Sequence, residues 1–243
     1  SVASCPFVMS GKAAKTAKSH VDEVSMMIGT DGSHETEYGG TTPAVGSPFA
    51  MTQWCAATRL NGISHTMYRR CDSVLIGFMG THQPAIWMGD YGFMTLMPQS
   101  GELKIKATDR QVRLEHGKEV ATPYYYKVYL ADHDVTTELV PTERAAKFRF
   151  TFPETKKAYI VIDAFDKGSY IKVLPAERKI IGYSTKNTGG VPRNFKNYFV
   201  IEFDKPFTYQ ATVADSIVKE NGTEQQADHA GAIIGFATKK GET

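Results

Sequence analysis

Strand-like runs recur along the chain from Glu102 onward, and in several of them apolar and polar residues alternate, which predicts β-strands. In residues 146–152, AKFRFTF, the side chains of Phe148, Phe150 and Phe152 fall on one face, and Lys147, Arg149 and Thr151 fall on the other. Similar runs rich in β-branched and aromatic residues recur about every ten residues, with turn residues between them. These runs are residues 102–107, 124–130, 135–141, 158–164, 170–174, 179–185, 198–203, 207–213 and 232–238. The spacing is typical of an antiparallel sandwich or barrel.

The part of the chain before Glu102 differs in composition and in residue pattern. Residues 21–101 are rich in Gly, Met and Thr and in turn signals, and we expect short strands at Phe49–Trp54, Ser73–Phe78 and Phe93–Met97. Residues 1–20 are small and polar without a sustained period, which predicts an irregular lead-in. Almost no helical periodicity is present, and this disfavours a parallel α/β fold. The sequence therefore predicts an all-β, many-stranded antiparallel β-sandwich over residues 21–243.

Composition and charge narrow the classes of function. Hydrophobic residues make up 42% of the chain and charged residues 22%, and the formal net charge is +2. Nucleic-acid binding is disfavoured, since there is no basic stripe to neutralise phosphates. No apolar run reaches the roughly 20 residues of a membrane span. No signal peptide is recognisable, which leaves the compartment open.

The three cysteines give little support for a metal or a disulfide framework. Cys55 and Cys71 are far enough apart in sequence to pair, but nothing in the sequence sets the distance between them. No Cys-x-x-Cys motif occurs, so a zinc site is disfavoured. Buried free thiols are the simpler interpretation.

The richest candidate for chemistry is residues 80–93, GTHQPAIWMGDYGF. A tryptophan plane suits the C–H face of a sugar ring, while carboxylate and imidazole groups suit its hydroxyls. We therefore take His82, Trp87, Gly89 and Asp90 as candidate substrate-binding residues. The alternative is that Trp87 plugs the end of the sandwich and Asp90 caps a turn. Trp54 lies inside a strand-like run and is expected in the core.

Two acidic stretches are weaker candidates. Residues 29–46 carry Asp31, His34, Glu35 and Glu37, which suggests a metal or sugar contact, but a solvated glycine-rich loop is favoured because the spacing of a calcium loop is incomplete. Residues 132–134, Asp-His-Asp, lie between two predicted strands, and a hairpin turn explains them more simply than a metal does. The sequence has no Gly-x-Ser-x-Gly elbow for a serine nucleophile. We assign no catalytic and no metal-ligating residue.

The order of these segments resembles a known family. MIGTDGSHETEYGGTTPAVGSPFAMTQ, followed by GFMGTHQPAIWMGDYGFMTLMP and by PYYYKVYLADHDVTTELVPTERAAKFRFTFP, is similar to the N-terminal domain of glycoside hydrolase family 92, the calcium-dependent exo-acting α-mannosidases. The similarity is clear from about Val21 to Ala164. The chain departs where the family's His-Thr-His is Gly80-Thr81-His82, and where its second aspartate is Phe93.

The resemblance implies a mutarotase-like supersandwich that packs on a C-terminal (α/α)6 helical barrel. The active site would lie between the two domains, with a glutamate acid, an aspartate base and the calcium site mainly in the barrel. The reaction would remove terminal α-linked mannose with inversion, which uses carboxyl groups about 6.5–9.5 Å apart. This chain shows no helical domain, so we expect the N-terminal domain alone, without hydrolase activity of its own. The resemblance also implies a periplasmic or extracellular location.

Three functional hypotheses follow. The first is the pocket wall of a mannosidase, with the barrel docked on an exposed apolar face and mannose-containing glycans as substrates. The second is a stand-alone carbohydrate-binding module without hydrolase activity, which needs a complete pocket within this chain. The third is a structural cell-surface domain with Trp87 in the core. Exposure of Trp87 beside a large apolar patch favours the first.

Overall fold

The computed structural model describes residues 19–31, 41–59, 67–81, 92–187 and 189–243, and these residues form an all-β sandwich of antiparallel sheets. The largest sheet has seven strands in the order β1-β3-β4-β10-β17-β14-β15. Its strands are β1 (Gln53–Ala57), β3 (Gly77–Thr81), β4 (Gly92–Ser100), β10 (Thr155–Asp163), β17 (Ala230–Thr238), β14 (Tyr209–Ala214) and β15 (Ile217–Glu220). The prediction of an all-β sandwich is confirmed.

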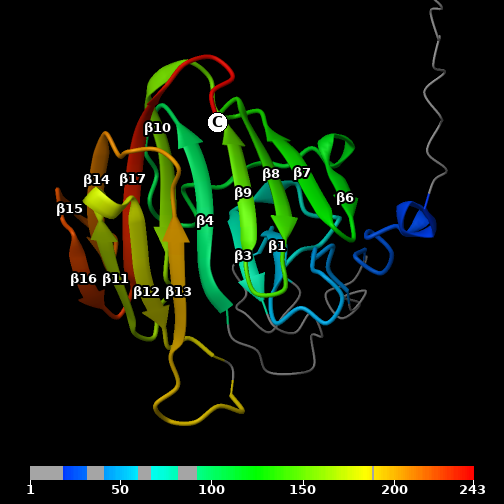
Figure 1. Ribbon diagram of the computed structural model, residues 1–243, viewed down its shortest axis with the longest axis horizontal. Helices are drawn as coiled ribbons and strands as arrows, with labels where there is room; N and C mark the ends of the chain where they lie inside the picture. The colour runs from blue at the N-terminus through cyan, green and yellow to red at the C-terminus, as the bar shows by residue number, and fades with distance from the viewer. Residues whose placement is uncertain (1–18, 32–40, 60–66, 82–91, 188) are drawn as a thin grey trace, which may run out of the picture.

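Two four-stranded sheets form the second layer. One has the order β6-β7-β8-β9, and the other has the order β13-β12-β11-β16. Their strands are β6 (Val120–Thr122), β7 (Tyr125–Leu130), β8 (Val135–Pro141), β9 (Ala146–Thr151), β13 (Asn197–Glu202), β12 (Lys179–Ser184), β11 (Ser169–Leu174) and β16 (Glu224–Ala227). Figure 1 shows them side by side, with β9 and β13 as the facing edges and β4 behind the gap.

The remaining elements are short. Strands β2 (Val74–Leu75) and β5 (Val112–Arg113) pair with each other. Three single-turn 3-10 helices are η1 (His20–Glu23), η2 (His116–Lys118) and η3 (Pro175–Glu177). No helix among the described residues is long and apolar enough to cross a membrane.

The core lies between the two layers, where the alternation of the sequence places its apolar face. In β9 the phenylalanine face points inward, and the Phe148 ring lies 5.4 Å from the Trp54 ring and 6.1 Å from the Phe78 ring. Ile160 and Ile162 of β10 are buried as well. Burial of such side chains is the main stabilising contribution to a sandwich. The prediction that Trp54 belongs to the core is confirmed.

The predicted strands from residue 124 onward are confirmed. The run at residues 102–107 is also predicted to be a strand, and it is not one. The backbone of this segment is hydrogen-bonded by the Gln99 side chain, where a strand would be hydrogen-bonded by a neighbouring strand. Gln99 Nε2 donates to Lys104 O at 2.7 Å, and Lys104 N donates to Gln99 Oε1 at 2.9 Å. The side-chain amide thus satisfies backbone groups that the alternating pattern assigns to a ladder.

Two of the three early strands are shifted from their predicted positions, whereas the one predicted at Phe93–Met97 lies within β4. The first strand begins at Gln53 and not at Phe49, because residues 47–50 form a turn in which Ala50 N donates to Ser47 O. Phe49 has a positive φ of 59° and is fully exposed. The strand predicted at residues 73–78 is divided into β2 and β3, and the division falls at Ile76.

Candidate functional site

The predicted substrate-binding residues His82, Trp87, Gly89 and Asp90 lie outside the described residues. The structure does describe where their segment leaves and rejoins the sandwich. Thr81 ends β3, Gly92 begins β4, and the two residues pair across the antiparallel ladder. The segment 82–91 therefore connects two neighbouring strands of the seven-stranded sheet.

Gly92 fixes one end of that connection. A Cβ atom at this position would lie 3.1 Å from Phe165 Cε2 and 3.3 Å from Met79 Sδ, so a larger residue fits only if these neighbours shift. The Gly92 carbonyl accepts a hydrogen bond from Nδ2 of the buried Asn197 at 3.0 Å. Asn197 is the first residue of β13. The candidate sugar-binding segment is thus attached to both layers of the sandwich at this end.

The acidic loop predicted at residues 29–46 is described only at its ends, and His34, Glu35 and Glu37 lie outside the described residues. Its two ends are tied to each other, since Thr41 N donates to Gly29 O at 3.2 Å. Thr30 O also accepts from Arg70 N at 3.0 Å, which links this base to the chain that follows residues 60–66. The ends of segments 32–40 and 60–66 are therefore close together.

A carboxylate–arginine pair fastens the base of segment 60–66. Arg59 donates from Nε to Asp72 Oδ2 and from Nη2 to Asp72 Oδ1, both at 2.7 Å. Thr58 Oγ1 donates to Asp72 Oδ2 at 2.6 Å, and Thr58 N donates to Met67 O at 2.7 Å. Bidentate pairs of this kind are both strong and geometrically specific. Asp72 is therefore a positioning group for the segment.

A second cluster surrounds the Glu119 carboxylate, whose side chain is fully buried. Tyr68 OH donates to Glu119 Oε2 at 2.9 Å, and Tyr126 OH donates to Glu119 Oε1. His116 Nδ1 lies 2.5 Å from Glu119 Oε2, while its Nε2 lies 2.7 Å from Asp72 O. Since a carbonyl only accepts, His116 Nε2 carries the hydrogen.

The Glu119 cluster raises the pKa of its neighbours. Burial, followed by the charge of Glu119, raises the pKa of Tyr68 and of Tyr126 well above that of an exposed tyrosine. The same two causes raise the pKa of the buried Cys55 thiol. Cys55 is therefore an inert buried thiol, in line with the sequence interpretation. Cys71 is exposed, so the expectation of a buried thiol is wrong for this residue, and neither of these two cysteines forms a disulfide in the described structure.

A third buried carboxylate, Asp163, lies at the end of β10. Arg110 Nη2 donates to Asp163 Oδ2 at 2.8 Å, and His229 Nε2 lies 2.6 Å from Asp163 Oδ1. Burial alone would raise the pKa of Asp163, but the hydrogen bond from His229 and the charge of Arg110 outweigh it and lower the pKa below its usual range. The bond to Asp163 in turn raises the pKa of His229. Sequence reasoning missed this site, because its members are far apart in the chain.

The Asp-His-Asp stretch forms the turn between β7 and β8, as predicted. Asp132 Oδ2 accepts from Arg113 N at 2.7 Å, and Asp134 has a positive φ of 49°. His133 Nδ1 lies 3.1 Å from Ser100 O, and burial lowers the pKa of His133. Across the described ranges, no three His, Cys, Asp or Glu side chains are grouped so that they could hold a metal ion.

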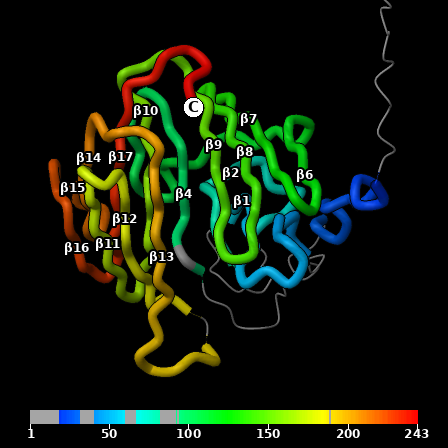
Figure 2. The backbone as a smooth tube through the Cα atoms, in the orientation of Figure 1, coloured from blue at the N-terminus to red at the C-terminus, as the bar shows by residue number. Residues whose placement is uncertain are grey.

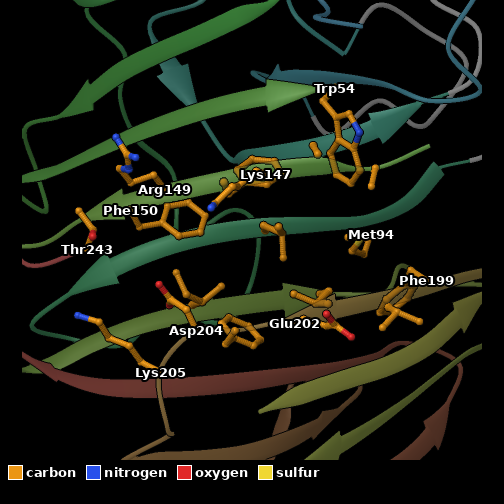
Figure 3. A pocket seen from close by; sticks show the side chains of 18 of the residues that line it. Trp54, Met94, Lys147, Arg149, Phe150, Phe199, Glu202, Asp204, Lys205 and Thr243 are labelled. Carbon is orange, nitrogen blue, oxygen red and sulfur yellow. The ribbon is translucent and has the colours of Figure 1, made fainter. Parts of the chain in front are cut away.

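A groove of about 660 Å³ lies between β9 and β13. Its floor is apolar and is formed by Met94 and Leu96 of β4, Ile160 of β10 and Phe236 of β17. Figure 3 shows charged side chains only along its walls and at one end. Trp54, Met94 and Phe199 lie at the other end of the groove. This end is close to β3 and β4, the strands that contain Thr81 and Gly92.

The groove walls are formed by consecutive residues of the two edge strands β9 and β13. Phe148 and Phe150 line it from β9, and Phe199 and Ile201 line it from β13. A sugar site needs a few polar groups that converge on the ligand, and an apolar floor does not supply them. The floor of the groove therefore suits an apolar surface, whereas charged side chains line its walls and one end. Sequence reasoning missed the groove, because it depends on which strand edges face each other.

The comparisons with known proteins identify the family. A model of the glycosyl hydrolase family 92 N-terminal domain matches residues 23–243. Among solved structures, the family GH92 inverting mannosidase BT2199 from Bacteroides thetaiotaomicron VPI-5482 has 38% identity and a TM-score of 0.88, over 95% of this chain and 31% of that one. The GH92 α-mannosidase BT3965 from Bacteroides thetaiotaomicron has 30% identity and a TM-score of 0.80, over 91% and 32%.

The chain thus spans about a third of the length of these solved structures. The comparison with curated proteins found no match. The family model covers most of the chain, and the solved relatives share both sequence and fold with it. The chain belongs to glycosyl hydrolase family 92 and corresponds to its N-terminal domain.

Proposed function

We propose that this chain is the N-terminal domain of an enzyme that removes terminal α-linked mannose from glycans with inversion, and that it forms one wall of the active site. The observation that carries the proposal is the match of the family model from residue 23 to residue 243. The solved relatives are described as mannosidases, and BT2199 as an inverting one. Their chains are about three times as long, so the proposal assigns the rest of the site to a C-terminal (α/α)6 barrel.

The two buried carboxylates of this chain support the proposed division of labour. An inverting pair needs an acid and a base about 6.5–9.5 Å apart with room for water between them. Asp163 and Glu119 are buried, and each is occupied by hydrogen-bond partners within the sandwich. Such carboxylates hold the fold together and are not placed to protonate a glycosidic oxygen. We therefore assign the acid and the base to the barrel.

The contribution of this chain is to bind and orient the sugar. In the proposal Trp87 stacks on the sugar ring, Asp90 and His82 hydrogen-bond to hydroxyls, and Gly89 lies beside Asp90 in the same wall. The described anchors of this wall are Thr81 and Gly92. Holding a sugar in one orientation against a separate acid–base pair is a recognised source of rate enhancement.

Calcium is part of the proposal only for the whole enzyme. Among the described residues no three His, Cys, Asp or Glu side chains are grouped so that they could hold a metal ion. We place the ligands mainly in the barrel, where a bound calcium would hold sugar hydroxyls. We also propose a periplasmic or extracellular location, which fits an enzyme that acts on glycans.

The wall assignment is tested in the full-length enzyme with the substitution Trp87→Ala. Loss of the stacking plane should lower kcat/KM on α-mannobiosides about 10- to 100-fold, equivalent to roughly 1.4–2.8 kcal/mol, while the melting temperature stays the same. Tyr198→Ala, an exposed aromatic residue on β13, is the matched control and should leave kcat/KM unchanged. An unchanged kcat/KM in Trp87→Ala would contradict the wall assignment. NMR of the first-formed product checks for β-mannose, the inverted anomer.

A further inference from the structure

We propose that the groove between β9 and β13 is the seat of one extended strand, supplied by the polypeptide that follows Thr243 in the longer family members. This strand would join the two four-stranded sheets into one continuous layer. The inference rests on the family membership and not on the proposed mannosidase activity. Figure 2 traces the C-terminal end of the described chain to the end of the groove beside β9.

Both walls of the groove are open strand edges. Among the described residues β9 pairs only with β8, and β13 pairs only with β12. Thr142 N donates to Ala145 O at 2.7 Å in the β8–β9 turn, so the alternation of the ladder directs the backbone groups of Lys147 and Arg149 toward β8. The backbone groups of Phe148 and Phe150 therefore point into the groove.

The same reasoning applies to the opposite wall. Phe203 N donates to Arg178 O at 2.9 Å, just beyond the end of the β12–β13 ladder. The ladder alternation then directs the backbone groups of Phe199 and Ile201 toward β12, and those of Val200 and Glu202 toward the groove. Two rows of open donors and acceptors face each other above an apolar floor, which is the arrangement that β-strand addition completes.

The first step of such a pairing is already present. Phe152 and Glu242 form an antiparallel bridge in which Phe152 N donates to Glu242 O at 3.0 Å. The Glu242 carboxylate also reaches Lys205 beyond β13, at 2.5 Å. Glu242 is therefore held between the two walls at the end of the groove, and Thr243 lines the groove itself. Figure 3 shows Thr243, Arg149 and Lys205 at this end.

The bridge also fixes direction and register. Because it is antiparallel, residues after Glu242 would run beside β9 from Thr151 back toward Ala146. A strand of about six residues covers this edge at roughly 3.4 Å per residue. The first, third and fifth residues after Thr243 would then lie opposite Phe150, Phe148 and Ala146, above the apolar floor. We expect apolar side chains at these positions and polar side chains between them.

The test compares the 243-residue chain with a chain extended by the next ten residues of the full-length protein. In the extended chain the backbone amides of Phe148, Phe150, Val200 and Glu202 should exchange with deuterium about a hundredfold slower or more. The Arg149 amide is the internal control, since it already bonds to β8 and should be protected in both chains. Exchange is followed by NMR, residue by residue.

Equal exchange of the Phe148 and Phe150 amides in the two chains would overturn the proposal. Equal protection combined with a dimeric short chain in sedimentation would assign the groove to a second copy, which also contradicts it. If the short chain precipitates, the comparison uses the extended chain with aspartate at the first and third added positions. These changes should remove the protection at Phe148 and Phe150 and leave Arg149 protected. The outcome is independent of mannosidase activity, so the two proposals fail separately.

Discussion

The two sides of the sandwich each bury a carboxylate, and they neutralise it in different ways. At the end of β10, Asp163 faces the guanidinium of Arg110, which is buried and always charged, together with His229. Beside β7, Glu119 receives two tyrosine hydroxyls and faces His116, without an arginine contact among the described residues. The carboxylate at one site is paired with a buried arginine, and the carboxylate at the other is held by two tyrosine hydroxyls and a histidine. They should therefore respond differently to substitution and to pH.

The two carboxylates also lie in regions with different secondary structure. The side around Asp163 is built from long ladders, since β10 and β17 each have nine residues. The side around Glu119 is built from shorter strands and loops, and the cluster links Tyr68, η2 and β7. A buried polar network whose members are all hydrogen-bonded rigidifies its surroundings and helps to specify a unique core.

The largest expected effect tests the charge pair. Asp163→Asn would leave the guanidinium of Arg110 buried without its counter-charge, so we expect a loss of about 3–5 kcal/mol in the free energy of unfolding. Asp166→Asn is the matched control, since Asp166 is more exposed and pairs with Lys186, and it should cost at most about 1 kcal/mol. Urea denaturation measures both. Equal losses of unfolding free energy in the two variants would contradict the stabilising role of the buried Asp163–Arg110 pair.

A smaller effect is expected at the hydrogen-bond cluster. Glu119→Gln keeps one carbonyl acceptor for a tyrosine hydroxyl but loses the other, so the expected cost is about 1–3 kcal/mol. Glu115→Gln, at the partly exposed N-cap of η2, should change stability by less than about 0.5 kcal/mol. Urea denaturation again gives the comparison. If Glu119→Gln costs more than Asp163→Asn, the distinction between the two sites is wrong.

The smallest effect separates the sites by pH. The folded-state pKa of His229 is raised, so the stability that its charged form contributes is present below its unfolded pKa of about 6.5 and is lost as the pH rises through the raised value. Asp163 has a lowered pKa and stays ionised across this window. His229→Gln should therefore reduce the melting temperature more at pH 6 than at pH 9. A penalty that is independent of pH would contradict the assignment.

The strands could be predicted where the residues themselves carry the periodicity. The run at residues 135–141 matches β8 (Val135–Pro141) at both ends, because β-branched residues dominate it and turn residues flank it. Residues 102–107 alternate between polar and apolar residues, but the Gln99 side chain takes the place of a partner strand. Alternation predicts an extended backbone and says nothing of which group will bond to it.

The buried clusters could not be predicted, because each joins residues that are distant in sequence. Asp163 is 53 residues from Arg110 and 66 from His229. The family and its fold, in contrast, were evident from the order of local motifs. The substrate-binding assignments stay predictions, because His82, Trp87, Gly89 and Asp90 lie outside the described residues.

The central claim is that this chain forms one wall of a mannosidase site whose acid–base pair lies in another domain. The most direct measurement is cleavage of α-mannobiosides with calcium, comparing the 243-residue chain with the full-length protein. The account predicts activity in the full-length protein and none in the 243-residue chain. Activity in the 243-residue chain would place a complete acid–base pair within it, and would contradict the division between the two domains.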